Sequence, residues 1–464
     1  MIDQNTICAI STSPGMGAIA VIRLSGADAV KITDHIFRSV VKDKRLKDQP
    51  ANSLHYGSIV NGDIIIDEVV VAVFKAPYSY TGEDTVEISC HGSIVIQQSI
   101  LQLLVDRGSR LAKPGEFTQR AFLNGKMDLS QAEAVADLIS ASSLAAHKLA
   151  LNQMRGGVST EIKLLRSQLL TFTSLVELEL DFSEEDVEFA NRTDLLQLCT
   201  GILHLINKLT NSFEYGNALK NGIPVAIIGD ANVGKSTLLN ALLNEEKAIV
   251  SEIAGTTRDV IEDVVIIDGI QFRFIDTAGI RTTTDTIENL GIERTFNKIE
   301  QAEIVLTLID ASRSFNDIIV FLTRMSDKLH EKKSALVINK IDLAEQNVID
   351  ELIRMGNEMQ FPTLSIAARE NTNIDQLITF LIDSVQNKAY TENDVIITNV
   401  RHYESLKSAG IAIERVIEGL KTGISGDFLS QDIRECLYYL GEITGEISTD
   451  EVLGNIFKHF CIGK

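Results

Sequence analysis

The segment that most restricts the possible folds of this chain is Gly229–Ser236, which reads Gly-Asp-Ala-Asn-Val-Gly-Lys-Ser. It matches the pattern G-x-x-x-x-G-K-[ST] and lies between an apolar run, Val225–Ile228, and a helix-forming run, Ser236–Leu243. In such a strand–loop–helix unit, backbone N–H groups surround phosphates, the lysine offsets their charge, and the serine hydroxyl suits Mg²⁺. A chance glycine-rich turn is the alternative, but it would not come with both flanking elements. The segment therefore predicts a nucleotide-binding α/β domain.

Three further motifs indicate a guanine nucleotide. Asp276-Thr-Ala-Gly279 follows an apolar run, and it offers a carboxylate for an Mg²⁺-bound water and an N–H group for a γ-phosphate. Asn339-Lys-Ile-Asp342 follows another run, and its aspartate can accept both N1–H and N2–H of guanine, which adenine does not offer. Gly255-Thr-Thr-Arg-Asp259 supplies a switch threonine. Each motif alone is weak, but their order and spacing resemble those of the translation-factor-like GTPases.

A fifth motif is altered in this chain. That group of GTPases usually carries Ser-Ala-Arg or Ser-Ala-Lys where this sequence has Ala367-Ala368-Arg369. We expect the Ala368 N–H group to bind the guanine carbonyl, without the hydrogen bond with which a serine hydroxyl would brace the loop. The predicted GTP-binding residues are Asn232, Val233, Gly234, Lys235, Ser236, Thr237, Ser251, Glu252, Ile253, Ala254, Gly255, Thr256, Thr257, Asp276, Thr277, Ala278, Gly279, Asn339, Lys340, Asp342 and Ala368.

The means of hydrolysis must differ from that of Ras-like enzymes, which place a glutamine directly after the DxxG motif. Here that residue is Ile280, so we consider Arg281 and Glu288 as catalytic candidates; a charged surface helix is the alternative reading of that segment. The side-chain oxygen of Asn232, beside carbonyls of the 251–256 loop, would complete an oxygen cage for a monovalent cation that stabilises charge on the leaving oxygens. Alternatively, Asn232 only braces its own loop.

The chain as a whole is expected to be a multidomain α/β and α protein. In the first quarter, short β-branched runs predict an α+β domain with strands near 18–24, 62–73 and 85–89. The proline-free stretch 126–222 is helical in pattern, with a capping box at Ser130 and Glu133 and an amphipathic stretch over 164–180. Central strand runs alternating with helical patterns predict a mostly parallel sheet. The expected domains are an α+β domain (1–124), a helical domain in two halves (125–219 and 385–464) and a GTPase domain inserted between them (220–384).

Composition excludes several classes of protein. Lys plus Arg is 43 and Asp plus Glu is 64, a net charge of −21, so non-specific coating of nucleic acid is excluded and any RNA contact needs a local basic patch. The five cysteines are scattered without CxxC spacing, which argues against a disulfide framework or a zinc ribbon and indicates a reducing compartment. Residues 1–20 carry no basic segment typical of a signal peptide. We therefore expect a cytoplasmic protein that does not enter a membrane.

Several segments outside the central domain resemble one family over essentially the whole chain. They are Ala18–Gly26, Tyr80-Thr-Gly-Glu-Asp84, Lys113–Lys126 and the terminal Cys461-Ile-Gly-Lys464. Together with a GTPase domain inserted between helical halves, they resemble the MnmE (also TrmE) family of tRNA modification GTPases. The terminal Cys-Ile-Gly-Lys is very specific to that family.

The resemblance implies an activity and its partners. The first domain would bind 5-formyl-tetrahydrofolate or a related one-carbon folate and would form a constitutive homodimer. The GTPase domains would pair across the nucleotide in a K⁺-dependent manner that activates hydrolysis. With the flavoprotein MnmG, as a heterotetramer, the protein would install an aminomethyl or carboxymethylaminomethyl group on C5 of the wobble uridine of certain tRNAs.

The resemblance also implies roles for single residues. K⁺ ligands would be Asn232, Ser251, Ile253 and Thr256, with Ser251 where threonine is common; Mg²⁺ ligands would be Ser236 and Thr257. Glu288 would orient the attacking water. Folate contacts would be Arg23, Glu87, Lys126 and Lys464.

Two segments leave alternatives open. The family's Gly-His-Gly-Gly appears here as Cys90-His91-Gly92-Ser93, in which His91 is either catalytic or a packed structural residue. Cys461 is a nucleophilic or redox residue, or one that packs against the folate.

Two other functions also remain as alternatives. A GTP-gated switch in ribosome or RNA assembly shares the central motifs, but lacks this N-terminal domain and C-terminal end. A folate-dependent transferase with a purely regulatory GTPase domain would bind folate in a way that is indifferent to GTP turnover.

Overall fold

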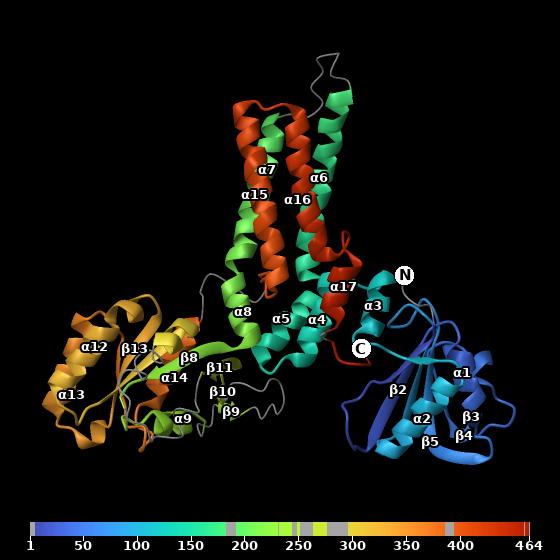
Figure 1. The fold of residues 1–464 in the computed structure, drawn as a ribbon, viewed down its shortest axis with the longest axis horizontal. Coiled ribbons are helices and arrows are strands. Elements are labelled where there is room, and N and C mark those ends of the chain that lie inside the picture. The colour runs from blue at the N-terminus through green and yellow to red at the C-terminus, as the bar shows by residue number, and fades with distance from the viewer. Residues whose placement is uncertain are drawn as a thin grey trace. The chain divides into compact units, whose positions relative to one another are not determined.

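The computed structural model describes residues 5–181, 192–230, 232–243, 248–250, 263–275, 296–385, 394–458 and 460–463 (Figure 1). The chain forms two compact units, and each is built from separate stretches of sequence. The first unit comprises Met1–Ile139, Gln153–Ile202 and Ser408–Lys464, and the second comprises Ser140–Asn152 and Leu203–Lys407. Among the helices in these described ranges, none combines the length and the apolar character that a membrane crossing requires.

The first unit contains a seven-stranded sheet with the strand order β3-β4-β5-β6-β2-β1-β7. Neighbouring strands are antiparallel, except that β1 and β7 are parallel. The predicted α+β fold of this region is confirmed. The strands are β1 (Ile7–Ile10), β2 (Ile19–Ser25), β3 (Phe37–Ser39), β4 (Ser53–Asn61), β5 (Ile64–Phe74), β6 (Thr85–His91) and β7 (Arg110–Leu111).

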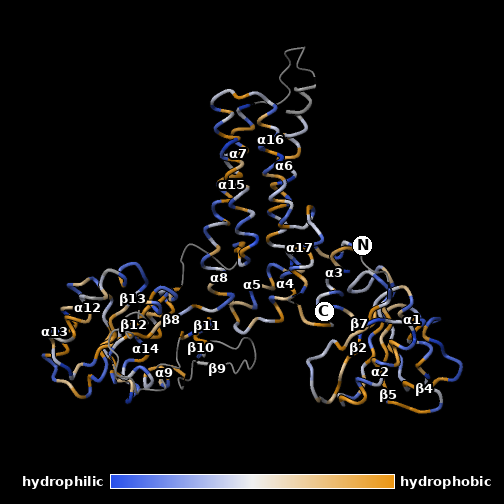
Figure 2. Tube along the Cα trace, in the orientation of Figure 1, coloured by the Kyte–Doolittle hydropathy of each residue, from blue (hydrophilic) through white to orange (hydrophobic). Residues whose placement is uncertain are grey.

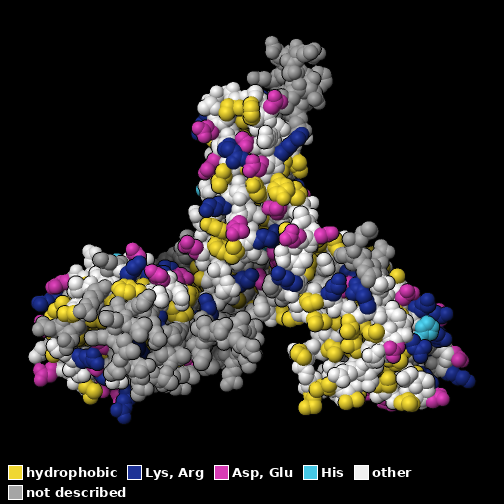
Figure 3. All heavy atoms as spheres, in the orientation of Figure 1, with side chains coloured by type: hydrophobic (Ala, Val, Ile, Leu, Met, Phe, Trp, Pro, Cys, Tyr) yellow, Lys and Arg dark blue, Asp and Glu magenta, His cyan; other side chains and the backbone are white. Residues whose placement is uncertain are grey.

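The two faces of this sheet differ. Val69, Val71 and Val73 of β5 point to one face, where α1 (Ala29–Ile36) and α2 (Ile94–Asp106) cover them. Figure 2 shows the corresponding hydrophobic character along these strands. On the other face, cross-strand neighbours such as Tyr56 and Val70 are exposed, since side chains alternate along a strand. Hydrophobic side chains accordingly gather on the surface of this domain (Figure 3).

The remainder of the first unit is helical, as the proline-free sequence predicts. The long helix α6 runs beside α16, and Arg166 of α6 pairs with Glu446 at 2.8 Å. A short helix, α3, packs against α17 through Phe122 and Phe457. The helices are α3 (Glu116–Leu123), α4 (Leu129–Ser140), α6 (Gly157–Asp181), α16 (Gly426–Thr444) and α17 (Asp450–Phe457), with parts of α7 (Arg192–Asn211) and α15 (Val400–Thr422).

The predicted capping box at Ser130 and Glu133 is wrong, because the box lies two residues earlier, at Asp128 and Gln131. The N–H group of Gln131 donates to Asp128 Oδ1 (3.1 Å), and the N–H group of Asp128 donates to Gln131 Oε1 (3.0 Å). Asp128 is therefore the N-cap of α4, because a carboxylate is at least as good an acceptor as a serine hydroxyl. Ser130 instead donates to the same Asp128 carboxylate at 2.9 Å.

The second unit is built on a seven-stranded sheet with the order β14-β13-β12-β8-β11-β10-β9. Strands β14 to β11 in this order are parallel, whereas β10 is antiparallel to both β11 and β9, so the predicted mostly parallel sheet is confirmed. The strands are β8 (Ile223–Ile228), β9 (Ala248–Val250), β10 (Asp263–Ile267), β11 (Ile270–Phe274), β12 (Ile304–Asp310), β13 (Lys333–Asn339) and β14 (Thr363–Ser365).

Helices cover both faces of this second sheet, so its central strands are apolar on both sides. Ile227 packs with Leu238 and Leu377 on one face, and Ile228 packs with Leu322 and Leu352 on the other. The helices of this unit are α5 (Leu144–Met154), most of which it includes, α8 (Phe213–Asn221), α9 (Lys235–Leu243), α12 (Phe315–His330), α13 (Gln346–Glu358) and α14 (Ile374–Val385).

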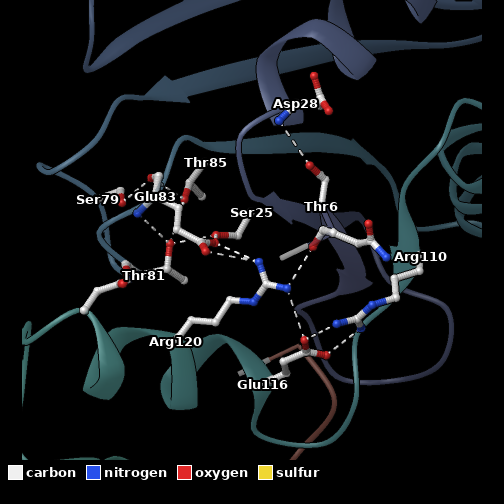
Figure 4. A network of polar contacts seen from close by, with 12 residues as sticks. Thr6, Ser25, Asp28, Ser79, Thr81, Glu83, Thr85, Arg110, Glu116 and Arg120 are labelled. Atoms are coloured by element: carbon white, nitrogen blue, oxygen red, sulfur yellow. Dashed lines mark hydrogen bonds and ion pairs between the residues drawn. The ribbon is translucent and has the colours of Figure 1, made fainter. Parts of the chain in front are cut away.

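A buried network of charges fixes α3 against the loop between β5 and β6 in the first unit (Figure 4). Arg120 donates to Glu83 at 3.0 Å, to Glu116 at 3.2 Å and to the Asn5 carbonyl at 2.8 Å. Arg110 holds the same Glu116 carboxylate at 2.5 and 2.8 Å. Burial alone would raise the pKa of Glu116, but the hydrogen bonds and charges of its partners keep that pKa below its ordinary value. The Glu116 carboxylate at the centre of the network therefore stays charged.

Replacing Arg120 with methionine should destabilise the first unit strongly. The change leaves the carboxylate of Glu83 without its arginine partner and removes one of the two arginine partners of buried Glu116. Such a loss typically costs about 3–5 kcal/mol of the free energy of unfolding. Urea unfolding of the full chain, followed by circular dichroism, measures the change. The control is Lys31→Met, because Lys31 pairs with Asp28 at 3.7 Å on the surface, where such a pair contributes less than about 1 kcal/mol. Equal shifts for both variants would contradict this account of the network.

Candidate functional site

The phosphate-binding loop lies at the carboxyl-terminal edge of the second sheet. Strand β8 ends at Ile228, the loop follows, and α9 begins at Lys235. The neighbouring strands β12 and β13 end at Asp310 and Asn339, which face each other in register. In open α/β sheets, ligands bind at this edge, because the loops that follow parallel strands meet there. The structure thus brings the predicted loop and the predicted base-recognition motif together.

Two glycines of this loop are required by geometry. Gly229 has φ +145° and Gly234 has φ +104°, values that side-chain-bearing residues rarely adopt. A Cβ atom at Gly229 would collide with the Leu308 carbonyl, and one at Gly234 would collide with Asn339 Nδ2. The loop can therefore lie this close to β12 and to the base-recognition motif only with glycine at both positions.

The ammonium group of Lys235 lies inside the loop. It donates to the carbonyls of Gly229 and Asp230, each at 2.7 Å. Burial lowers the pKa of Lys235, the charge of Lys298 lowers it further, and Asp230 partly opposes this. A cation whose hydrogen bonds to the described residues are to neutral carbonyls, and which lies near another cation, is well suited to an anionic ligand. Phosphate oxygens would restore the lost stabilisation of its charge.

The motif after β13 holds the same loop from the other side. Asn339 Nδ2 donates to the Val233 carbonyl at 2.8 Å, and Lys340 Nζ donates to the Asn232 carbonyl at 2.9 Å. The Ala368 N–H group donates to Asn339 Oδ1 at 3.0 Å, so it braces the motif directly. Asp342 is exposed in a short 3₁₀ turn, Ile341–Leu343, with its carboxylate available for a base edge.

Two contacts at this edge were missed by sequence reasoning. Asp310, the last residue of β12, pairs with Lys340 at 2.6 Å, and Arg313 pairs with Asp230 at 2.7 Å. For Asp310 a signal was present, because it ends a buried apolar strand run exactly as Asn339 does. For Arg313 no pattern in the sequence indicated the contact.

The described residues fit a nucleoside triphosphate and its Mg²⁺ ion. Glycine positions that exclude any side chain leave the backbone accessible, Ser236 and Thr237 are exposed at the start of α9, and Asn232 is exposed with φ +63°. The other predicted ligands of the nucleotide, Mg²⁺ and K⁺, and the two switch candidates lie outside the described residues: Ser251, Glu252, Ile253, Ala254, Gly255, Thr256, Thr257, Asp276, Thr277, Ala278, Gly279, Arg281 and Glu288.

The first unit places two of the predicted folate contacts side by side. Arg23 of β2 and Glu87 of β6 are cross-strand partners, and their side chains pair at 2.8 Å. The Arg23 guanidinium also lies over the rings of Tyr80 and Phe117, at 5.4 and 5.7 Å from their centres. Tyr80 and Thr118 share a hydrogen bond of 2.9 Å. Sequence reasoning did not identify Tyr80 or Phe117 as contacts of Arg23.

The C-terminal segment of the chain reaches this pair. Ser11 donates to the Gly463 carbonyl at 3.1 Å, and Arg23 approaches the same oxygen at 3.5 Å. Cys461 is exposed two residues earlier, and its carbonyl accepts from the Gly115 N–H group at 3.4 Å. Lys126 donates to the Pro77 carbonyl at 2.9 Å, in the same loop as Tyr80, whereas Lys464 lies outside the described residues.

The imidazole of His91 is not buried in the core, and it has a polar partner. The ring atom Nδ1 lies 2.7 Å from Asp67 Oδ1, and the backbone N–H group of His91 donates to Asp67 Oδ2 at 2.8 Å. The Asp67 carboxylate is buried and the imidazole is exposed. Its neighbour Cys90 is buried, and burial raises the pKa of that thiol to about 11.

Comparisons with known proteins agree over the whole chain. A family model described as MnmE helical domain matches residues 129–461, and one described as GTP-binding protein TrmE N-terminus matches residues 6–126. A protein from Bacteroides thetaiotaomicron named tRNA modification GTPase MnmE is 56% identical over 467 residues, which cover 100% of both chains. The protein of the same name from Flavobacterium johnsoniae is 52% identical, again over 100% of both chains.

One solved structure illustrates the more distant matches. Era from Aquifex aeolicus, bound to GDP.AlF4-, is 26% identical and covers 41% of this chain and 66% of its own. Its TM-score of 0.28 is too low to establish a shared overall fold.

Replacing Gly234 with alanine should weaken nucleotide binding. The new Cβ displaces Asn339 Nδ2 and breaks its hydrogen bond to Val233, a loss worth roughly 1–3 kcal/mol, or about tenfold or more in affinity. Titration with a fluorescent GDP analogue measures the dissociation constant. Gly201→Ala in α7 is the matched control, because no atom lies within 4 Å of a Cβ there. An unchanged affinity in Gly234→Ala would contradict the predicted close approach.

Proposed function

The chain belongs to the MnmE family of tRNA modification GTPases and is a GTP hydrolase, and from that premise we propose that it couples GTP hydrolysis to modification of C5 of the tRNA wobble uridine. The proposal rests chiefly on one observation: the described residues of a phosphate-binding loop are braced by the base-recognition motif, in a chain that matches its relatives from end to end. The product is 5-aminomethyl- or 5-carboxymethylaminomethyluridine, made together with the flavoprotein MnmG.

The described residues divide the work of binding GTP. Lys235 exchanges its carbonyl partners for phosphate oxygens, and the N–H groups at the start of α9 bind the same phosphates. Asp342 accepts from the guanine edge. Mg²⁺, held by Ser236 and Thr257, would offset charge on the phosphates. Glu288 orients the attacking water, and Arg281 is a second catalytic candidate in the same segment.

A K⁺ ion at the phosphates would stabilise the charge that an arginine finger stabilises in other GTPases. Asn232 supports this role because its left-handed backbone conformation exposes the side chain while its own carbonyl is bonded to Lys340. Among the described residues, the contact that braces the loop at this position is made by the carbonyl. Ser251, Ile253 and Thr256 would provide the remaining oxygens, as in the family, once two GTPase domains pair across the nucleotide.

The first domain would provide a constitutive homodimer and a folate site. Exposed apolar side chains on one face of its sheet favour self-association, since an apolar surface is costly in water; they include Leu54, Tyr56 and Val70. Arg23 and Glu87 suit a folate because the carboxylate accepts from an aminopyrimidine edge and the aromatic rings of Tyr80 and Phe117 flank the site. Lys126 and Lys464 would bind the glutamyl tail.

The remaining assignments follow from the same family. We place the domain bounds at 1–124, 125–219, 220–384 and 385–464, with Cys461 near the folate as a lining or reactive residue. The whole-length match disfavours a ribosome-assembly switch, which would lack the N-terminal domain. Free cysteines, four of them buried, suit a reducing cytoplasm.

GTP hydrolysis should be faster in KCl than in NaCl at equal ionic strength, by about tenfold or more, because the cation stabilises charge that develops only in the transition state. The stimulation should vanish in Asn232→Ala, and specific activity should rise with enzyme concentration when the GTPase domains pair weakly. Asn52→Ala, another asparagine with a left-handed backbone, serves as the control. Equal rates in both salts would remove K⁺ from the mechanism and leave the GTPase assignment intact.

Glu87→Gln and Arg23→Met should each weaken binding of 5-formyl-tetrahydrofolate by about 10- to 100-fold, since each removes a hydrogen bond to a charged group. Isothermal titration calorimetry on the full chain measures the affinity. Glu68→Gln is the control, because that carboxylate lies on the same sheet but bonds to Tyr56. If all three variants bind folate like the unmodified chain, the ligand lies elsewhere.

A further inference from the structure

Asp310 is a buried carboxylate at the edge of the sheet where GTP binds. Its side chain is 6% exposed, and Lys340 pairs with it at 2.6 Å. The other oxygen, Oδ1, accepts from the N–H group and the hydroxyl of Ser312, at 3.0 and 2.7 Å. Burial alone would raise the pKa of Asp310, but the hydrogen bonds from Lys340 and Ser312 and the charge of Lys340 hold it below its ordinary value. Asp310 is thus a fixed anion.

The sheet itself sets the position of this anion relative to Lys340. Asp310 and Asn339 end neighbouring parallel strands as register partners, and the Ala311 N–H group donates to the Asn339 carbonyl at 3.0 Å. Lys340 follows directly, with a left-handed backbone (φ +64°) that turns the chain at the end of β13. The pairing of β12 with β13 therefore fixes the backbone positions of Asp310 and Lys340 relative to each other.

Lys340 connects the Asp310 carboxylate to the phosphate-binding loop. Its ammonium group bonds both the Asp310 carboxylate and the Asn232 carbonyl, while Asn339 holds the next carbonyl, Val233. In a trans peptide, the C=O group and the following N–H group point in opposite directions. Carbonyls fixed toward β13 therefore direct the N–H groups of residues 233 and 234 to the opposite side, where they can bind phosphate oxygens.

We propose that Asp310 is a positioning residue for nucleotide binding, which acts through Lys340 to fix the Asn232 peptide of the phosphate-binding loop. Lys340 is 31% exposed, so without Asp310 its long side chain has solvated conformations that release the Asn232 carbonyl. Asn232 then relaxes from its left-handed conformation, which only neighbouring contacts maintain. The proposal depends on GTP binding alone and not on K⁺, folate or dimerisation.

A purely structural ion pair between β12 and β13 is the competing explanation, and the chain contains one for comparison. Lys333, the first residue of β13, pairs with Glu303, directly before β12, at 3.1 Å. That pair joins the same two strands at their other ends and is partly exposed. It provides a matched control, because it has the same charges and the same strands but no connection to the loop.

The test compares Asp310→Asn with Glu303→Gln in the full chain. Affinity for a fluorescent GDP analogue is measured in NaCl, which keeps any role of K⁺ out of the result. We expect Asp310→Asn to bind about 10- to 100-fold more weakly, the range expected for one hydrogen bond to a charged group, and Glu303→Gln to bind within about twofold of the unmodified chain. If Asp310→Asn does not fold by circular dichroism, Asp310→Ser, which also removes the carboxylate, takes its place with the same expectation.

A double-mutant cycle separates positioning from general stability. Lys340→Met alone should weaken GDP binding, and adding Asp310→Asn should weaken it no further, since the carboxylate acts only through the lysine. Losses that simply add, or an affinity within twofold of the unmodified chain for Asp310→Asn, would overturn the proposal. Neither result would affect the GTPase assignment, which rests on the loop and on the family match.

Discussion

The N–H groups that surround a phosphate are available in this loop because the carbonyls of the same peptides are bonded elsewhere. Asn339 and Lys340 hold the carbonyls of Val233 and Asn232, and Lys235 holds those of Gly229 and Asp230. These bonds fix the direction of the loop's peptide planes before any ligand binds. Base recognition and phosphate binding are therefore one structural unit: the motif that reads guanine also supports the loop that holds its phosphates.

Buried and exposed charges have different consequences in this chain. The pair between Asp310 and Lys340 and the network around Arg120 lie largely out of water, so removing one member leaves a charge that the protein must still solvate. Pairs such as Lys31 with Asp28 are open to solvent and contribute little. The buried pairs occur where a loop must be held against a sheet: the phosphate-binding loop in one unit, and the loop carrying Tyr80 in the other. Charge is used here to position segments rather than to stabilise the core.

How far the sequence predicts this structure depends on whether the signal is local. The phosphate-binding loop, the mostly parallel sheet and the helical stretches follow from motifs and periodicity, which depend on neighbouring residues. The cap of α4 was misplaced because Ser130 and Asp128 are both good caps, and only the structure shows which one the backbone of Gln131 meets. Tyr80 and Phe117 were missed for another reason: their partner Arg23 lies 57 and 94 positions away along the chain, so only the fold brings them together. For Asp310 the end of an apolar strand run was a signal, but its pairing with Lys340, 30 positions on, depends on the register of β12 and β13.

The two sites also differ in the charge that they offer a ligand. Lys235 is held by neutral carbonyls and lies near Lys298, and Asp230 opposes this positive charge only in part, so the described residues of the site favour an anion such as a triphosphate. Arg23 is already neutralised by Glu87 and lies over two aromatic rings. A simple anion would gain little there, because it would have to displace a carboxylate. A ligand with hydrogen-bond donors for Glu87, an aromatic face for Tyr80 and Phe117 and a separate acidic tail would gain on all three counts. Under the proposed function, the same chain, with a net charge of −21, binds a triphosphate at one site and would bind a flat amphoteric ring at another.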